Sequence, residues 1–259
     1  MNIIDTHTHL NDRQLLSDID SVVQRAKENG VKAVFNNGDS LESFDVILSL
    51  QKRYPDFCYS VIGLHPEFAL RGEEYISEAY SYIREHTNEI NAVGEIGLDY
   101  HYGKDDNLVS CQKKMFIEQI RLAKELDLPI VIHSRDADRD TFDIIKQERP
   151  PKFDLHCYSG SYELLKEYLR LGLECHIGVG GVVTFKNARV LKEVVSNTDI
   201  SVFLTETDAP YLAPTPFRGQ RNEPSYLPHI IKEIAVLKGM DENEAGEILY
   251  KNGAGFYGI

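Results

Sequence analysis

The sequence predicts an α/β fold in which eight parallel strands close into a (β/α)8 TIM barrel. Short β-branched runs recur along the chain, and each is followed by a helical pattern, which is typical of βα units in a parallel sheet. Their average spacing is close to the roughly 30 residues per unit that a barrel of about 250 residues implies. A chain of 259 residues with 42% hydrophobic side chains can bury a full core, so we expect one barrel domain over residues 1–259.

The predicted strands are short, largely apolar runs that carry polar residues at their C-terminal ends. In a closed barrel the C-terminal ends of all strands lie on one rim, and the active sites of barrel enzymes occupy that rim. Residues at these ends are therefore the first candidates for a functional site. The eight runs are residues 2–7, 31–37, 58–64, 92–97, 129–134, 153–157, 173–179 and 201–208.

Three segments have the pattern of surface helices. Residues 17–30 carry an apolar face between a Ser or Asp cap and a terminal Asn-Gly, and residues 115–129 repeat the pattern and end before a proline. In residues 240–252, Asp241 precedes Glu244 by three positions, as at the start of a capping box. The apolar faces of the first two helices are Ile19, Val22, Val23 and Ala26, and Ile117, Ile120, Ala123 and Leu126.

Residues 209–224 hold four of the ten prolines of the chain. A stiff linker between two domains is one interpretation. The residues that follow, 225–259, are too few for an independent domain without disulfides or metals. We therefore predict an ordered loop after the last strand, on the face of the barrel where loops carry function.

Composition limits the compartment and the partners. The formal net charge of −13 argues against broad wrapping of a polyanion, although a formal count leaves out bound metal ions. No apolar run approaches the roughly 20 residues of a membrane span, and the N-terminus lacks the features of a signal peptide. The four cysteines show no zinc-knuckle spacing, which fits reduced thiols. We expect a cytoplasmic protein without membrane partners.

Residues able to bind a metal recur at the C-terminal ends of five predicted strands. His7 and His9 are two positions apart, so in an extended strand both imidazoles point to the same side. Taken singly, a histidine at a strand end is usually a hydrogen-bonded core residue, and a single carboxylate is usually a cap or solvated. Because residues of this kind lie at the ends of five predicted strands, and all strand ends meet on one rim, a metal site is favoured over these separate roles. Its predicted ligands are His7, His9, Glu95, His133, His156 and Asp208.

Four histidines and two carboxylates are too many ligands for one tetrahedral zinc ion. They suit two divalent ions about 3.5 to 4 Å apart, bridged by one carboxylate and a water. Nitrogen and oxygen ligands without thiolate are compatible with Zn, Mn, Co, Fe(II) and, less comfortably, Mg. The predicted cofactors are thus two divalent metal ions, and the donor set leaves the element open.

Eight motifs, in order and over nearly the whole chain, resemble those of the TatD family of metal-dependent deoxyribonucleases. They are IIDTHTHL, GLHPE, GEIGLDY, IHSRDA, HCYSG, GGVVTFKNA, TETDAPYLAP and PFRGQRNEP. The resemblance implies a metallo-dependent hydrolase barrel of the amidohydrolase-like kind, a divalent-metal centre and hydrolysis of phosphodiester bonds, commonly from the 3′ end of DNA. Tyr158 and His101 stand where the family commonly has Phe and Tyr, and neither position is a predicted ligand.

The resemblance also implies how the ligands divide between the two metals. His7, His9 and Asp208 would hold one metal, His133 and His156 would hold the other, and Glu95 would bridge them. No ligand of the family pattern is missing from the sequence.

Three residues besides Glu95 have expected catalytic roles. Asp208 can orient a water or take its proton. Glu206 lies two residues earlier on the same predicted strand, so it should face the same side as a base or extra metal ligand, and an ion-pair partner inside the barrel is the alternative. His65 follows a strand and can donate to a phosphate or a leaving group, unless it is an ordinary turn residue before Pro66.

Arg218, Arg221 and Lys186 are the predicted substrate-binding residues. The guanidinium fork of arginine matches phosphate oxygens, and the glycine between the two arginines allows close approach of the backbone to a ligand. As an alternative, the arginines make only surface ion pairs, for example with Glu223.

Together these features favour a metal-dependent phosphodiesterase of DNA, a 3′–5′ exodeoxyribonuclease that grips single-stranded ends, as a monomer or weak homo-oligomer. The alternative is a binuclear amidohydrolase or esterase acting on a C–N or C–O bond, such as an aminoacyl-tRNA ester. Many carbon–nitrogen hydrolases bridge their metals with a carbamylated lysine, whereas the matching strand here offers Glu95. A noncatalytic metal-binding module is disfavoured, because structural sites are normally coordinatively closed.

Overall fold

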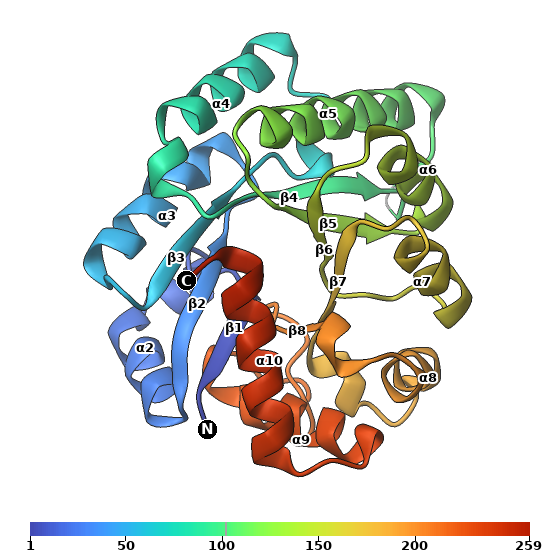
Figure 1. Cartoon of the computed structure of the whole chain (residues 1–259). Coiled ribbons are helices and arrows are strands. Elements are labelled where there is room, and N and C mark those ends of the chain that lie inside the picture. The colour runs from blue at the N-terminus through green and yellow to red at the C-terminus, as the bar shows by residue number, and fades with distance from the viewer. Residues whose placement is uncertain (102) are drawn as a thin grey trace.

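The computed structural model of the chain is a barrel of strands surrounded by helices (Figure 1). The structure describes residues 1–101 and 103–259, and within them eight parallel strands pair in sequence order. The predicted (β/α)8 barrel is thereby confirmed. The strands are β1 (Ile3–Thr8), β2 (Val31–Asn37), β3 (Cys58–Ile62), β4 (Ala92–Asp99), β5 (Ile130–Arg135), β6 (Lys152–Leu155), β7 (Glu174–Val179) and β8 (Phe203–Thr205).

The ring closes between β8 and β1 through side chains as well as backbone. The Thr6 hydroxyl donates to the Thr205 carbonyl oxygen at 3.0 Å, and the Thr205 hydroxyl donates to the Ile4 carbonyl oxygen at 3.1 Å. Beyond the end of β8, Thr8 and Ala209 form a parallel bridge. The first and last strands are therefore held side by side, which brings their C-terminal ends to the same part of the rim.

Helices cover the outside of the barrel, and none in the described part of the chain is both long and apolar enough to cross a membrane. The predicted helix 17–30 is α2, whose expected apolar face is buried. The predicted helix 115–129 is α5, which begins nine residues earlier than expected at Asp106. The helices are α1 (Arg13–Leu16), α2 (Ile19–Glu28), α3 (Leu41–Arg53), α4 (Glu73–Glu85), α5 (Asp106–Glu125), α6 (Asp138–Glu148), α7 (Tyr162–Leu169), α8 (Arg189–Asn197), α9 (Leu227–Lys238) and α10 (Glu242–Tyr257).

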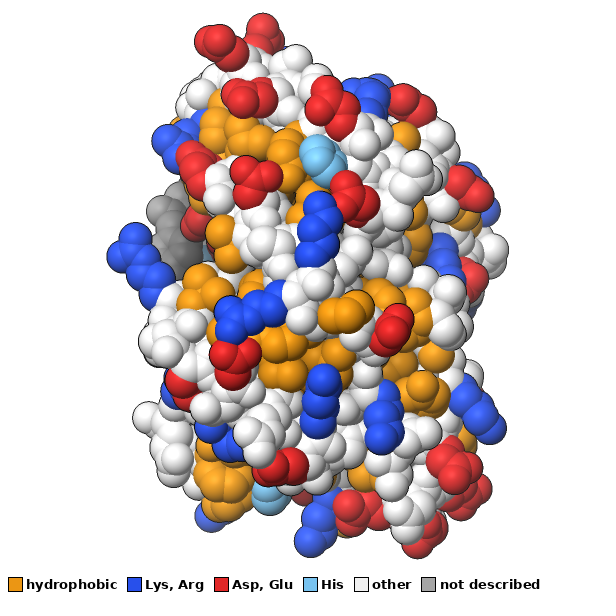
Figure 2. All heavy atoms as spheres, turned by 90° about the vertical axis from the view of Figure 1, so that its left-hand side faces the viewer, with side chains coloured by type: hydrophobic (Ala, Val, Ile, Leu, Met, Phe, Trp, Pro, Cys, Tyr) orange, Lys and Arg blue, Asp and Glu red, His pale blue; other side chains and the backbone are white. Residues whose placement is uncertain are grey.

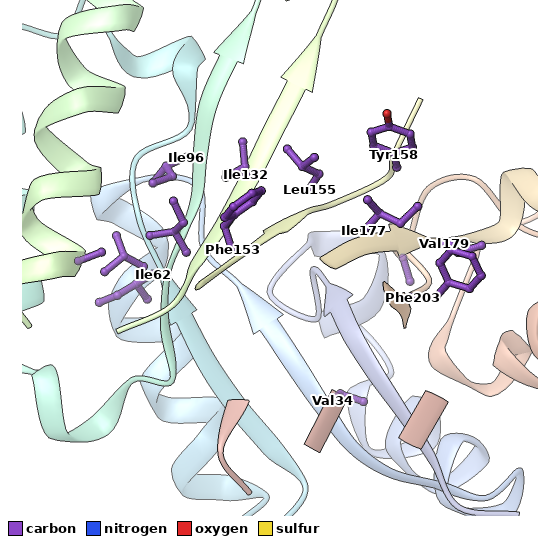
Figure 3. Close-up of a cluster of buried hydrophobic side chains, with 14 of the residues drawn as sticks. Val34, Ile62, Ile96, Ile132, Phe153, Leu155, Tyr158, Ile177, Val179 and Phe203 are labelled. Atoms are coloured by element: carbon purple, nitrogen blue, oxygen red, sulfur yellow. The ribbon is translucent and has the colours of Figure 1, made fainter. Parts of the chain in front are cut away.

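One apolar layer lies between the strands and the surrounding helices. Figure 3 shows its strand side chains, which come from successive strands around the barrel. These residues pack with buried helix residues such as Val22 of α2 and Phe116 of α5. The strand residues labelled in the figure include Val34, Ile62, Ile96, Ile132, Phe153, Ile177 and Phe203.

A second apolar cluster fills the barrel interior near the N-terminal ends of the strands. Ile4, Phe35 and other interior residues pack there against Phe256 and Tyr257 at the end of α10. The ring of Tyr257 stacks on that of Phe35, with centroids 3.5 Å apart, and its hydroxyl donates to the Thr6 carbonyl oxygen at 2.9 Å. Helix α10 begins as predicted, since the Asp241 side chain accepts the backbone N–H groups of Asn243 and Glu244. It closes this end of the barrel, and the polar site lies at the other.

The last predicted strand, 201–208, is much shorter in the structure. Residues 200–202 form a 3-10 turn in which the Asp199 side chain accepts the Ser201 N–H, so the strand begins only at Phe203. After Thr205 the regular strand ends, although the Asp208 N–H still donates to the His7 carbonyl oxygen at 2.9 Å, and Asp208 has a left-handed φ of 54°. Glu206 and Asp208 therefore do not follow the alternation of one strand.

Charges are mixed on the side of the barrel that carries α3 (Figure 2). Lys and Arg side chains are interspersed there with Asp and Glu side chains. Broad polyanion binding needs a continuous basic track. This face, with its mixed charges, is unsuited to such binding, as the net charge of −13 indicates.

Candidate metal centre

The C-terminal ends of the strands open into a pocket of about 1200 Å³. Among the residues that line it are five of the predicted ligands, namely His9, Glu95, His133, His156 and Asp208. His7, the sixth, is fully buried below the pocket, with its Nε2 atom 3.2 Å from Nε2 of His9. The structure thus brings all six predicted metal ligands together.

The backbone of β1 and its neighbour β2 orient the first two histidines. His7 lies on β1 and His9 just beyond it, and their rings meet from the same side, as the two-residue spacing predicts. Nδ1 of His9 is 3.0 Å from the Asn37 carbonyl oxygen, which can only accept, so this nitrogen carries the hydrogen. Nε2 of His9 therefore faces the pocket, which is the arrangement by which a second hydrogen bond orients a metal-binding imidazole.

Glu95 on β4 lies between two pairs of histidines. Its Oε1 atom is 2.7 Å from Nδ1 of His133 and 3.0 Å from Nε2 of His156. Its Oε2 atom is 3.5 Å from Nε2 of His7 and 3.6 Å from Nε2 of His9. Each carboxylate oxygen thus faces its own imidazole pair, so one side chain links two adjacent ligand sets.

Asp208 extends the ligand set formed by His7 and His9. Its Oδ1 atom is 3.4 Å from Nε2 of His9 and 3.8 Å from Nε2 of His7. Two compact groups of donor atoms share Glu95, and within each group all donors lie within 4.8 Å of one another: His7, His9 and Glu95, and Glu95, His133 and His156.

Both carboxyl groups of the cluster have a lowered pKa, although Glu95 is buried and Asp208 is mostly buried. Burial alone would raise the pKa of Glu95, but the charge of His156 and hydrogen bonds from His133, His156 and His7 hold it well below its usual range. Burial likewise opposes ionisation of Asp208, and the hydrogen bond from His9 lowers the pKa of this carboxyl below its usual value. Two buried anions demand nearby positive charge.

The histidines respond to this negative charge. Burial disfavours the charged form of His9, but the hydrogen bond to Asp208 and the negative charges nearby raise its pKa to about 9. His133 behaves in the same way, since hydrogen bonds to Asp99 and Glu95 outweigh burial and raise its pKa to about 9. Burial, together with the charge of His156, lowers the pKa of His7 to about 3. Protons on His9 and His133 thus offset the negative charge of the carboxylates, and bound divalent cations would take over this role.

The donor set fits borderline transition metals. Imidazole nitrogen and carboxylate oxygen suit Zn, Mn, Co and Fe(II). Cys157 lines the same pocket, and burial raises the pKa of its thiol well above the usual range. The residues present therefore fit two divalent ions held by nitrogen and oxygen.

Glu206 is not among the residues that line the pocket, whereas Asp208 is, so the two side chains do not share the face that the alternation suggested. Its side chain is fully buried, and Oε1 accepts the Cys157 N–H at 2.6 Å. It also lies 3.9 Å from Nδ1 of His156 and occupies the space that a Cβ atom at Gly178 would fill. Burial raises the pKa of Glu206 well above its usual value. These contacts suit a positioning residue for His156 better than a base in the pocket. The Glu206 carboxylate also forms a compact donor group with His7 and His156, so the role of extra metal ligand stays a prediction.

His65 reaches the pocket as expected and also makes a turn contact. Its Nδ1 accepts the Glu67 N–H at 3.3 Å, at the start of the 3-10 turn 66–68. Nδ1 is thereby the acceptor, so the hydrogen of the neutral ring is on Nε2, which points toward Glu95 Oε1 at 3.9 Å. Burial lowers the pKa of His65 to about 4, so it is a neutral hydrogen-bond donor near pH 7.

Asp99 is a member of the site that the sequence reasoning missed. Its Oδ2 atom lies 3.1 Å from Nε2 of His133, and the Gln112 side chain fixes the backbone of Asp99. Glu95 and Asp99 are four positions apart on β4, so strand alternation alone places both on one face. The motif GEIGLDY therefore already contained the spacing that could have identified Asp99 as a member of the site.

Arg221 does not lie in the metal pocket. Its guanidinium donates to Asp18 Oδ1 at 2.6 Å and Oδ2 at 3.0 Å, and to the Gln14 carbonyl oxygen. With Arg25 and Glu223 it lines a separate pocket of about 510 Å³. Asp18 precedes α2, so Arg221 fastens the loop 209–223 to the start of that helix. For Arg221 the structure thus agrees with the alternative of an ion pair and not with a place in the metal pocket.

The other two predicted cations are also outside the metal pocket. Arg218 is exposed and lies 3.5 Å from the ring centroid of Phe185, and Lys186 is exposed. Among the described residues, the cations that line the metal pocket are Arg13 and Arg135. Arg13 and Arg135 are therefore additional candidates for contact with a phosphate, and the substrate-binding role of Arg218 and Lys186 stays a prediction.

Replacing Arg221 is expected to affect stability. Arg221→Ala removes a two-pronged ion pair that is about one-third exposed, so we expect the free energy of unfolding to fall by about 1 kcal/mol. Urea unfolding measures the change. Arg221→Lys keeps the charge without the fork and should recover part of the loss. An unchanged unfolding midpoint in Arg221→Ala would contradict the fastening role.

Comparisons with known proteins agree with the motifs. The model of the family described as TatD related DNase matches residues 4–258. The chain is 39% identical to the uncharacterized metal-dependent hydrolase YabD of Bacillus subtilis over 254 residues, 96% of each chain. It is 33% identical to the 3′-5′ ssDNA/RNA exonuclease TatD of Erwinia tasmaniensis over 251 residues, 93% of this chain and 94% of the relative.

A solved structure leads to the same assignment. The crystal structure of YJJV, a TatD homologue from Escherichia coli, has a TM-score of 0.91 and 28% identity, over 99% of this chain and 98% of that chain. Sequence and structure thus match the same family along the whole barrel. The chain belongs to the TatD-related DNase family and is a metal-dependent hydrolase.

Proposed function

We propose that the protein is a two-metal phosphodiesterase that removes nucleotides from the 3′ end of single-stranded DNA. The observation that carries the proposal is the position of Glu95, whose two oxygens face separate histidine pairs. A pair of adjacent divalent ions is suited to in-line displacement at phosphorus, because it stabilises both the attacking and the leaving oxygen. The relative named as a 3′-5′ ssDNA/RNA exonuclease supports the substrate class and the direction.

The side chains of the chain have distinct tasks in this proposal. His7, His9 and Asp208 would hold one ion, His133 and His156 the other, and Glu95 both. When bound, the two ions would activate a water and neutralise charge on the phosphoryl oxygens. Asp208 remains anionic beside His9, so its carboxylate can take a proton from the attacking water.

Two residues beside the ligands complete the arrangement. Asp99 accepts from His133 and so fixes the orientation of that ring. His65 presents the hydrogen on Nε2 to the pocket and can donate it as a hydrogen bond to a phosphoryl oxygen. Because the ring is neutral near pH 7, His65 acts in this scheme as a fixed dipole and not as a strong acid.

The site favours a phosphodiester over an amide. Carbon–nitrogen hydrolases of related barrels often use a carbamylated lysine between their metals, and no lysine lies among the described residues that line this pocket. Arg13 and Arg135 line it instead, and arginine suits phosphate oxygens. Glu95 occupies the bridging position.

Removal of metal is expected to abolish turnover without unfolding the barrel. The protein would be stripped with chelator, and Mg, Mn, Co or Zn restored separately with single-stranded DNA labelled at its 3′ or 5′ end. Glu95→Gln is the control. We expect shortening from the 3′ end with at least one metal, and circular dichroism of the stripped protein close to that of the loaded one.

The other outcomes of this experiment are equally informative. Intact DNA with every metal would reject the nuclease and move the assignment to a small ester or amide in the same centre. Shortening from the 5′ end would reverse the direction while keeping the chemistry. Loss of the circular dichroism signal on stripping would indicate that the metals are structural.

A further inference from the structure

Two large side chains remain exposed at the mouth of the metal pocket. Tyr211 is 49% exposed and Leu212 is 38% exposed, and both line the pocket that contains the ligands. The ring of Tyr211 lies 6.2 Å from that of His9 at an angle of 65°. An exposed aromatic ring therefore lies beside His9, one of the candidate metal ligands.

The exposed ring of Tyr211 is held rigidly. Its N–H donates to the Asp208 carbonyl oxygen at 2.9 Å, and its own carbonyl accepts from Nδ2 of Asn222 at 2.6 Å. Its hydroxyl donates to Oδ2 of Asp12 at 3.1 Å. A side chain fixed at both ends loses little conformational entropy when a ligand stacks on it.

The backbone beside the ring is also constrained. Leu212 has a φ of 54°, a left-handed conformation that is uncommon for a residue with a branched side chain. Its carbonyl oxygen packs against Gly181, where a Cβ atom would lie only 2.1 Å away. Such unfavourable conformations persist only where the surroundings enforce them, and they concentrate at ligand-binding sites.

The chemistry around Tyr211 favours a neutral, flat ligand. The Asp12 carboxylate at the phenol repels a phosphate, whereas the amino groups of a base can approach it. The pocket of about 1200 Å³ is also larger than the roughly 300 to 1000 Å³ of ordinary small-molecule sites. Bases of single-stranded nucleic acids typically stack on aromatic side chains of this kind.

We propose that Tyr211, supported by Leu212, is a stacking platform for the base of a nucleotide next to the scissile phosphate. This inference rests on the proposed phosphodiesterase function and defines its substrate more closely. A single-stranded polynucleotide with an unstacked terminal base fits the site, whereas a base-paired end must first be opened.

The test compares the loss of the ring with the loss of the base. Wild type, Tyr211→Ala and Tyr211→Phe would be assayed on single-stranded oligonucleotides that carry an abasic spacer at each of the last three positions from either end, beside the normal oligonucleotide. Stacking on an aromatic side chain predicts that Tyr211→Ala lowers kcat/KM about tenfold on normal DNA. On DNA with the spacer at the stacked position we expect less than a twofold loss, because the partner of the ring is already missing.

Tyr211→Phe is the matched variant, because it keeps the ring and removes only the hydroxyl bonded to Asp12. We expect it to retain most of the base-dependent advantage. A second readout needs no turnover: with chelator present, 2-aminopurine at the stacked position should be quenched by wild type and by Tyr211→Phe, and much less by Tyr211→Ala.

Three results would overturn the platform. Equal loss on normal and abasic DNA in Tyr211→Ala would show that the ring acts through the metal site and not on a base. Equal quenching of 2-aminopurine by all three proteins would show that the base does not stack on the ring of Tyr211. If metal-loaded wild type cleaved neither substrate, the proposed nuclease activity would be rejected, and the stacking platform with it. Failure of the nuclease is thus distinguishable from failure of the platform alone.

Discussion

Glu95→Gln is expected to lower the rate of DNA hydrolysis by about a thousandfold. The substitution keeps the size of the side chain but removes the charge that links the His7 and His9 pair to the His133 and His156 pair. Metal ions at such centres stabilise transition-state charge by several kcal/mol, and a loss of about 4 kcal/mol is a thousandfold in rate. Single-turnover hydrolysis at saturating metal measures the change.

A carboxylate elsewhere in the same pocket provides the control for Glu95. Glu42 also lines the pocket, but its side chain is exposed and bonded to Arg71 and Tyr75. We expect Glu42→Gln to change the rate less than about threefold, in line with the small contributions of exposed ion pairs. Metal analysis should show fewer ions per chain in Glu95→Gln only. Near-normal hydrolysis by Glu95→Gln would remove Glu95 from the centre of the proposal.

The ligand cluster was predictable because barrels place all strand ends on one rim. His7 and His9 followed from strand alternation, and Glu95, His133, His156 and Asp208 followed from their position at the C-terminal ends of predicted strands. A shift of one or two residues in a strand boundary, as at β6, leaves such a residue on the rim. A small error in a predicted strand boundary therefore does not change the prediction that a residue lies on the rim.

The direction of a side chain beyond a strand was not predictable in the same way. Glu206 and Asp208 were expected on one face, but both lie past the end of β8, and Asp208 has a left-handed backbone conformation. The alternation rule applies only to extended backbone. Glu206 therefore does not line the pocket, and Gly178 leaves room for its side chain.

Long-range ion pairs set a second limit on prediction from sequence. Arg221 and Asp18 are 203 positions apart, and nothing local indicates that they meet. The guanidinium fork that suits phosphate equally suits a carboxylate, so residue type could not decide between them. Tyr211 was overlooked for a related reason, since only the folded loop shows that its ring remains exposed beside His9.

Gly97→Ala is expected to destabilise the barrel by about 3 to 5 kcal/mol and to disrupt the metal centre. Gly97 pairs with His133 across β4 and β5 and has a φ of 143°, which residues with side chains rarely adopt. A Cβ atom there would lie 2.0 Å from the His133 carbonyl oxygen. Backbone strain and steric overlap each cost about 1 to 3 kcal/mol, and the strand that carries His133 must move to relieve them.

Gly255→Ala is the matched control, because Gly255 lies within helix α10 and an added Cβ atom there has open space around it. We expect a gain of about 0.5 to 1 kcal/mol, as alanine is the better helix former. Thermal unfolding of both variants, with metal content, separates the two effects. If Gly97→Ala unfolded near the wild-type temperature and bound its full complement of metal, close backbone packing between β4 and β5 would not be what positions His133.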